Sequence, residues 1–189
     1  MLFAAMTAST FAQVEGKVRG GFDLGYCIPS DGGGGVAFNL NLGYNLQDNM
    51  TVGIRLGSAI MAKVDPFGEV ASAAANANYL ATFNYYFNSG SSPIAPFVGA
   101  GAGLYMLAAA SSGTANVVVD VGNRFGGMLT AGVELGKFRL ALEYNLIPSS
   151  AVNVTGTGGG GIHITNDKIP NSYLAITTGF YFGGGKWKK

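Results

Sequence analysis

The sequence of 189 residues is poor in charge. Lys, Arg, Asp and Glu together make up 11% of it, whereas soluble globular domains carry about 25%. A soluble domain of this size has to cover its surface with charged side chains, so the shortage favours a protein whose outside faces lipid. The formal net charge of +1 gives no electrostatic reason to expect nucleic acid as a partner.

Cysteine and histidine are each present once. Cys27 cannot form an internal disulfide, and we expect it to be a packing residue at the end of a strand. His163 has no hydrolase motif around the nearest serines, Ser149, Ser150 and Ser172, so we expect a solvated loop residue. One histidine and one distant cysteine cannot supply a zinc site. The sequence therefore predicts no cofactor, no metal and no enzymatic activity.

The long uncharged segment between Val70 and Val119 contains no Asp, Glu, Lys or Arg. By hydropathy alone it could hold two transmembrane helices, which need about 20 apolar residues each. However, glycine occupies alternate positions within Phe97–Met106, which is a period of two and not of 3.6. Pro93 and Pro96 stand at the start of that segment. The pattern therefore predicts strands.

The same alternation recurs along most of the chain. Within Phe138–Leu146, for example, every second residue is large and apolar, and the residues between are small or polar. Segments of this length can cross a bilayer, because a tilted strand needs about 9–11 residues. We predict eight of them, at 17–27, 36–45, 50–61, 74–87, 95–108, 125–136, 137–147 and 172–182. The fold class is therefore all-β, an eight-stranded antiparallel up-and-down transmembrane β-barrel.

The links between these segments alternate between long and short. Outer-membrane barrels have short periplasmic turns and long extracellular loops, and an even strand number closes the sheet without an unpaired edge in lipid. We therefore expect the long links to be extracellular and both termini to be periplasmic. The long links are Ile28–Gly35, Ala62–Ala73, Ala109–Arg124 and Pro148–Asn171, and the shorter ones are Leu46–Asn49, Asn88–Ile94 and the reversal at Gly136-Lys137.

Aromatic residues gather near the expected ends of the strands, as in the girdles that membrane barrels place at the two bilayer interfaces. The expected periplasmic girdle contains Tyr44, Tyr85, Phe87, Phe138, Phe180 and Phe182. The expected outer girdle contains Tyr26, Tyr105, Phe125, Tyr144 and Tyr173.

Six charged residues share the parity of the small residues and are expected to face the lumen. They are Arg19, Asp23, Arg55, Glu134, Arg139 and Glu143. A tight turn would place Glu134 opposite Arg139 as a cross-strand ion pair, with Arg19 at a similar depth. The other three would form a second layer. Because unpaired buried charges are costly, we expect a neutral network that plugs the lumen; the alternative is a narrow pore gated by rearrangement of the same pairs.

The ends of the chain have distinct compositions. Met1–Ala12 is apolar or small and resembles the hydrophobic region and cleavage site of a secretory signal peptide, so residues 1–12 are predicted to be a signal-peptide remnant. Residues 13–182 form the predicted barrel. Residues 183–189 form a short basic tail, whose Lys186-Trp187-Lys188-Lys189 is expected to lie at the periplasmic interface.

On these patterns the chain resembles the small eight-stranded outer-membrane barrels, such as OmpX, OmpW and the transmembrane domain of OmpA. It is especially similar to the small barrel domains common in Bacteroidota. The last segment, Tyr173–Phe182, looks like the aromatic-ended signal read by the barrel assembly machinery. The resemblance implies a location in the bacterial outer membrane and contact with the lipid bilayer and lipopolysaccharide. We expect a monomer, because a closed barrel has no edge to share.

Four functions remain open at this point. The first is a non-enzymatic barrel with a structural or surface-interaction role, carried by its extracellular loops. The second is a porin-like channel for ions or small solutes, and the third is an outer-membrane lipid-modifying enzyme that uses His163. The fourth is a soluble ligand-binding calyx, which would reverse the expected parity, with apolar residues inside and charges outside.

Overall fold

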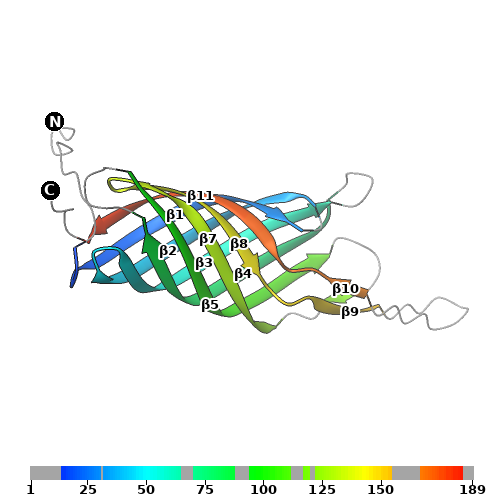
Figure 1. Cartoon of the computed structure of the whole chain (residues 1–189). Coiled ribbons are helices and arrows are strands. Elements are labelled where there is room, and N and C mark those ends of the chain that lie inside the picture. The colour runs from blue at the N-terminus through cyan, green and yellow to red at the C-terminus, as the bar shows by residue number, and fades with distance from the viewer. Residues whose placement is uncertain are drawn as a thin grey trace, which may run out of the picture.

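The computed structural model describes residues 14–30, 32–64, 70–87, 94–111, 117–119, 122–154 and 167–184. Eight strands close into an antiparallel barrel, in the order β1-β11-β8-β7-β5-β4-β3-β2 (Figure 1). The barrel strands are β1 (Val18–Pro29), β2 (Gly34–Gln47), β3 (Met50–Val64), β4 (Val70–Tyr86), β5 (Ile94–Ser111), β7 (Asn123–Leu135), β8 (Phe138–Leu146) and β11 (Tyr173–Gly183). The predicted fold class is confirmed. Each barrel strand pairs with the next one along the chain, and the last pairs with the first.

The eight expected segments all form barrel strands, and most extend beyond their expected ends. Within the described residues there is no helix of the length and apolarity needed to cross a bilayer. The uncharged segment instead forms β4 and β5, which stay in register as far as Ser72↔Ser111. The sequence did not reveal this extension, because runs such as Ala73–Ala75 and Ala108–Ala110 contain no alternation of polarity. Their backbones nevertheless remain paired.

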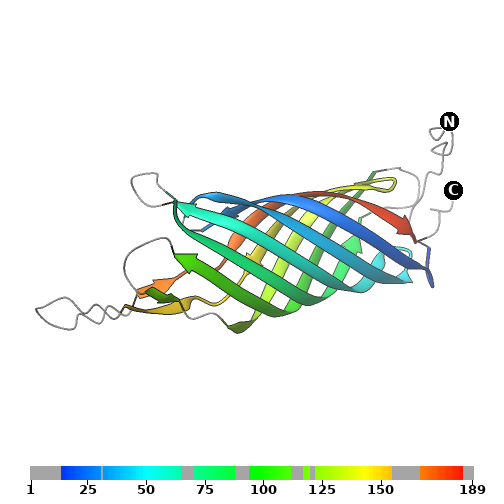
Figure 2. The same ribbon diagram turned by 180° about the vertical axis from the view of Figure 1, so that it is seen from behind.

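The strand register sets the stagger of the barrel. A path that starts at Arg19 and passes from each residue to its partner on the next strand goes once around the wall and returns to β1 at Pro29. Pro29 is ten residues further along the chain than Arg19. A stagger of this kind tilts the strands, as Figures 1 and 2 show from opposite sides. The interior of an eight-stranded barrel is just wide enough to be filled by side chains. The lumen is therefore a core that the inward-facing residues must fill.

Tight turns lie at the end of the barrel where β1 begins and β11 ends, which we call the terminus end. Residues Asp48 and Asn49 join β2 to β3, and Gly136 and Lys137 join β7 to β8. Gly136 has φ +66°, in the left-handed region that two-residue hairpin turns require and that glycine adopts without strain. The turn at Gly136-Lys137 is therefore where the sequence predicts it.

A second, small sheet lies at the opposite end, which we call the loop end. It contains β6 (Val117–Val119), β9 (Ser150–Val154) and β10 (Asp167–Ile169), in the order β10-β9-β6. These strands belong to the fifth and seventh links, and Figures 1 and 2 show β9 and β10 beyond the barrel wall. This sheet was not predicted from the sequence, because strands of three to five residues hold too few alternations to recognise.

The two faces of the wall differ in chemistry as the alternation predicts. The six charged residues named above all face inward and are buried, with 0% to 6% of their surface exposed. The outward face carries large apolar side chains, among them Leu40, Leu42, Ile54, Leu56, Leu104, Leu129, Leu140, Leu142 and Ile176. This is the reverse of the arrangement in a soluble calyx.

Candidate functional site

The six interior charges lie in two layers of the lumen, and even spacing along each strand puts them there. Arg19 and Asp23 on β1 are four residues apart, as are Arg139 and Glu143 on β8, so each pair points to the same face. Arg55 on β3 and Glu134 on β7 complete the set. Three positive and three negative side chains therefore meet inside one barrel.

The layer nearer the terminus end is built around Arg19. Its Nη2 lies 2.8 Å from Oε1 of Glu134, and its Nη1 donates to the Tyr86 hydroxyl at 3.0 Å. The Tyr86 hydroxyl in turn donates to the same Glu134 oxygen at 2.9 Å. These three residues form a closed ring of hydrogen bonds, in which the ion pair is supported by a neutral donor. Tyr86 was not among the predicted lumen residues, although it has the same inward parity as Leu80 and Asn78.

The expected ion pair between Glu134 and Arg139 is wrong. The two are register partners on β7 and β8, as predicted, but the carboxylate of Glu134 is bound by Arg19 from across the lumen. The guanidinium of Arg139 instead lies 4.0 Å from the centre of the Phe97 ring, and its Nη1 donates to the Tyr181 hydroxyl at 2.6 Å. Aromatic rings inside the lumen thus compete for Arg139, because a ring face attracts a desolvated cation.

The second layer is built around Arg55, and here the structure brings together the three expected residues. Arg55 Nη2 lies 2.7 Å from Oε1 of Glu143 and 3.5 Å from Oδ2 of Asp23. Asn41 Nδ2 donates to the same Asp23 oxygen at 2.7 Å, and Thr177 Oγ1 donates to Glu143 at 3.3 Å. Each carboxylate therefore has both a cation and a neutral donor.

One tyrosine connects the two layers. The Tyr181 hydroxyl accepts from Arg139 and donates to Asp23 Oδ2 at 3.4 Å. Tyr181 also lies beneath Arg19, whose guanidinium carbon is 4.2 Å from the ring centre. The interior charges thus form one continuous network through a buried phenol.

The two ends of the lumen are filled in different ways. At the terminus end, buried Asn45 donates from Nδ2 to the backbone oxygens of Val14 and Gly184, both at 3.1 Å, and accepts from Thr51 Oγ1 at 2.9 Å. Toward the loop end the lumen contains a buried cluster that is mainly apolar. Its members are Cys27, Ala37, Ala59, Met61, Leu80, Tyr105, Met128, Ile147, Tyr173 and Ala175.

Two residues expected in the outer girdle belong to this cluster. Tyr105 is 0% exposed and its hydroxyl donates to Asn145 Oδ1 at 2.9 Å inside the lumen. Tyr173 is also buried. Their assignment to the girdle is wrong, because it relied on their position near a strand end and did not consider which face of the strand they occupy. Tyr105 has the same parity as Gly101 and Gly103, which the alternation had placed inside.

The other girdle residues face outward. Tyr26, Phe125 and Tyr144 are exposed near the loop end. Tyr44, Phe87, Phe180 and Phe182 are exposed near the terminus end. Tyr85 and Phe138 are partly covered because each packs on a neighbouring ring, with centres 5.0 Å apart for Tyr85 and Phe87 and 5.6 Å apart for Phe138 and Phe180.

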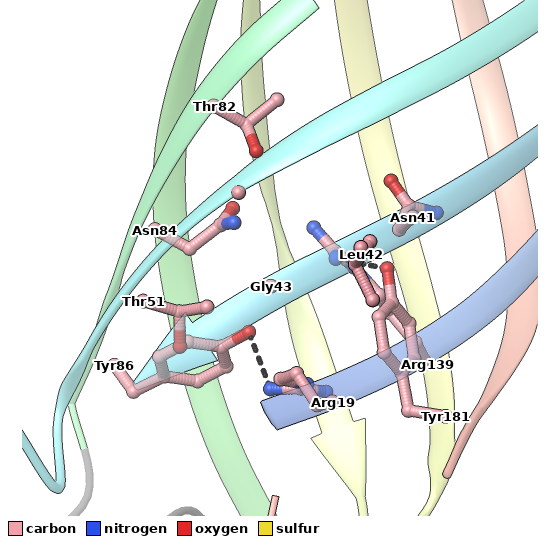
Figure 3. A pocket seen from close by; sticks show the side chains of 11 residues that line it. Arg19, Asn41, Leu42, Gly43, Thr51, Thr82, Asn84, Tyr86, Arg139 and Tyr181 are labelled. Carbon is pink, nitrogen blue, oxygen red and sulfur yellow. Dashed lines mark hydrogen bonds between the residues drawn. The ribbon is translucent and has the colours of Figure 1, made fainter. Parts of the chain in front are cut away.

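A cavity of about 20 Å³ remains in the terminus-side part of the lumen. In Figure 3, Asn84 and Tyr86 lie on one side of it, and Asn41, Arg139 and Tyr181 on the other. A cavity needs roughly 10–15 Å³ to hold one water molecule, so this space admits only one or two species of that size.

The other residues that the sequence offered for catalysis or metal binding form no such site within the described residues. No group of three or more His, Cys, Asp or Glu side chains that could hold a metal occurs in the described ranges. His163 lies outside those ranges. Ser172 Oγ accepts from the backbone N–H of Ile147 at 3.1 Å, and Ser150 Oγ accepts from Asn171 at 2.9 Å, so both serines brace the start of the seventh link.

Comparison with solved structures identifies the fold. The crystal structure of the outer membrane protein OprG from Pseudomonas aeruginosa matches 93% of this chain and 99% of its own, with a TM-score of 0.55 and 10% sequence identity. The chain has the fold of the small outer-membrane β-barrels. No family model and no curated protein matches the sequence itself.

Two further small outer-membrane barrels show weaker likeness. The N-terminal β-barrel domain of Pseudomonas aeruginosa OprF is 13% identical, with 90% of this chain and 100% of that one covered and a TM-score of 0.47. Neisserial surface protein A is 15% identical, with 88% and 96% covered and a TM-score of 0.47. The closer similarity to Bacteroidota barrel domains stays a prediction.

Proposed function

We propose that this small barrel is an integral outer-membrane protein that presents its loop end at the cell surface and keeps its lumen closed. The observation that carries the proposal is the filling of the lumen. Two layers of hydrogen-bonded charges and an apolar cluster occupy it, with a cavity of about 20 Å³ in the terminus-side part. A lumen packed in this way suits an anchor better than a conduit.

The outward face supports the membrane location. Soluble monomers rarely expose contiguous apolar patches larger than a few hundred Å². Here large exposed apolar side chains occur on every barrel strand, with aromatic residues toward both ends. Phe180 and Phe182 place exposed rings at the end of β11, which fits a last strand read by the assembly machinery.

The loop end supports a surface role. The sheet of β6, β9 and β10 gives two of the long links a paired backbone, which a simple connection between strands does not need. In the proposed orientation this sheet faces the exterior, where it could contact lipopolysaccharide or a macromolecular partner. The turns at Asp48-Asn49 and Gly136-Lys137 then lie in the periplasm.

Cysteine labelling in intact cells tests this orientation. In a Cys27→Ala background, Ser149→Cys places an exposed thiol at the loop end, and Gln47→Cys places one at the terminus end. A large polyethylene-glycol maleimide should label Ser149→Cys in intact cells, and Gln47→Cys only after the outer membrane is permeabilised. If only Gln47→Cys were labelled in intact cells, the orientation would be opposite to the one proposed. Recovery of the protein in the soluble periplasm would refute the membrane location.

A narrow channel gated by the interior charges is the second candidate. The observation that favours it is that Glu134 has Arg139 as its register partner but pairs with Arg19, so a second cation stands next to the carboxylate. Exchange of Glu134 between the two arginines would rearrange the terminus-side layer. Channel recordings separate this function from that of a closed anchor.

A further inference from the structure

The charged side chains that line the cavity in the terminus-side part of the lumen all carry the same sign. Its lining includes two charged side chains, Arg19 and Arg139, and both are cations. The rest of the lining is neutral: Asn41, Leu42, Gly43, Thr51, Gly53, Thr82, Asn84, Tyr86 and Tyr181. The three interior carboxylates do not belong to it.

The two arginines differ in how their charge is balanced. Arg19 has a direct ion pair with Glu134 at 2.8 Å. Arg139 reaches a carboxylate only through the Tyr181 hydroxyl, which is 3.4 Å from Asp23. Its Nε is fully buried and has no hydrogen-bond partner among the described residues. The six interior charges balance over the whole lumen, but around this cavity two guanidinium groups face a single carboxylate that is already paired with Arg19, so the local field favours an anion.

We propose that this cavity is a binding site for a small monovalent anion such as chloride, held by Arg139 and Arg19 with the amide groups of Asn41 and Asn84 beside it. Asn84 can turn its amide N–H groups toward an anion, and Asn41 has a second amide N–H besides the one that it donates to Asp23. The volume selects a halide over larger oxyanions, because only one or two water-sized species fit. A metal cation is disfavoured by the two guanidinium groups.

Bromide is the direct probe of this site. Crystals of the barrel grown or soaked in sodium bromide should show an anomalous peak between Arg139 and Asn84. Bromide only on the outer surface of the barrel, with water in the cavity, would overturn the proposal.

Chloride should also stabilise the folded barrel in solution. The temperature at which the unboiled gel shift is lost should be higher in sodium chloride than in sodium gluconate at equal ionic strength. At about ten times Kd the rise should be roughly 3–6 °C. Equal midpoints in the two salts would argue against a chloride site.

Two variants and a control assign the effect to the cavity. Arg139→Gln should weaken chloride binding roughly 10- to 100-fold, because a charged donor is lost. Lys17→Gln removes the same charge from an exposed position at the same end and should keep the full chloride effect. If Arg139→Gln does not fold, Asn84→Leu, which fills the cavity without changing the net charge, should abolish the bromide peak. A chloride effect that is equal in wild type and in a folded cavity variant would contradict the assignment.

Discussion

At the scale of single residues, the lumen shows which inferences parity alone supports. The inward position of all six charged residues follows from alternation, because residues an even number apart on a strand share a face. The choice of partner does not follow, since it depends on side chains that meet across the lumen. Phe97 and Tyr181, which hold Arg139, were not recognised as lumen residues, although Phe97 has the parity of Gly99 and Tyr181 that of Gly179.

A double-mutant cycle tests the pairing of Glu134. Removing one partner of a buried ion pair costs about 3–5 kcal/mol, so Glu134→Gln and Arg19→Met should each lower the free energy of unfolding strongly. The coupling energy between these two substitutions should exceed about 1 kcal/mol and be larger than that between Glu134→Gln and Arg139→Met. Urea unfolding in lipid vesicles measures both. A larger coupling energy with Arg139 would show that Glu134 pairs with Arg139, as the sequence suggested.

At the scale of elements, the glycines on the inward face make room for the charge network. Gly21 on β1 lies under Tyr181 of β11, and a Cβ there would be 2.6 Å from the Tyr181 ring and 2.8 Å from the backbone oxygen of Phe180. Its neighbour Gly20 faces the other way, and a Cβ there would find its nearest atom, the backbone oxygen of Asn41, at 3.9 Å. The sequence showed which glycines face inward, but not which of them touch a ring.

Gly21→Ala and Gly20→Ala form a matched pair on one strand. Gly21→Ala should lower the free energy of unfolding by about 1–3 kcal/mol, because the neighbouring backbone cannot move away. Gly20→Ala should leave it unchanged or raise it by up to about 1 kcal/mol through lower chain entropy in the unfolded state. The measurement is the urea midpoint of the gel-shifted form. Equal effects at the two positions would mean that Tyr181 does not pack against β1 as described.

At the scale of the whole molecule, bulk composition and alternation were sufficient to predict the barrel. The shortage of charge indicated a lipid-facing surface, the strand lengths indicated a bilayer crossing, and the alternating links indicated the two ends. The small sheet at the loop end was not predictable, because its pairing joins strands from distant links, β6 with β9. The interior cavity was not predictable either, since it is the space left over after the side chains pack.

Planar-bilayer recording of the refolded protein shows whether the barrel is closed. Flotation of the same proteoliposomes and the unboiled gel shift should first show that the barrel is inserted and folded. We expect a silent bilayer, because two charge layers and the apolar cluster fill the lumen. Discrete openings of uniform size, altered by Glu134→Gln, would instead show that the lumen conducts and that the barrel is a channel.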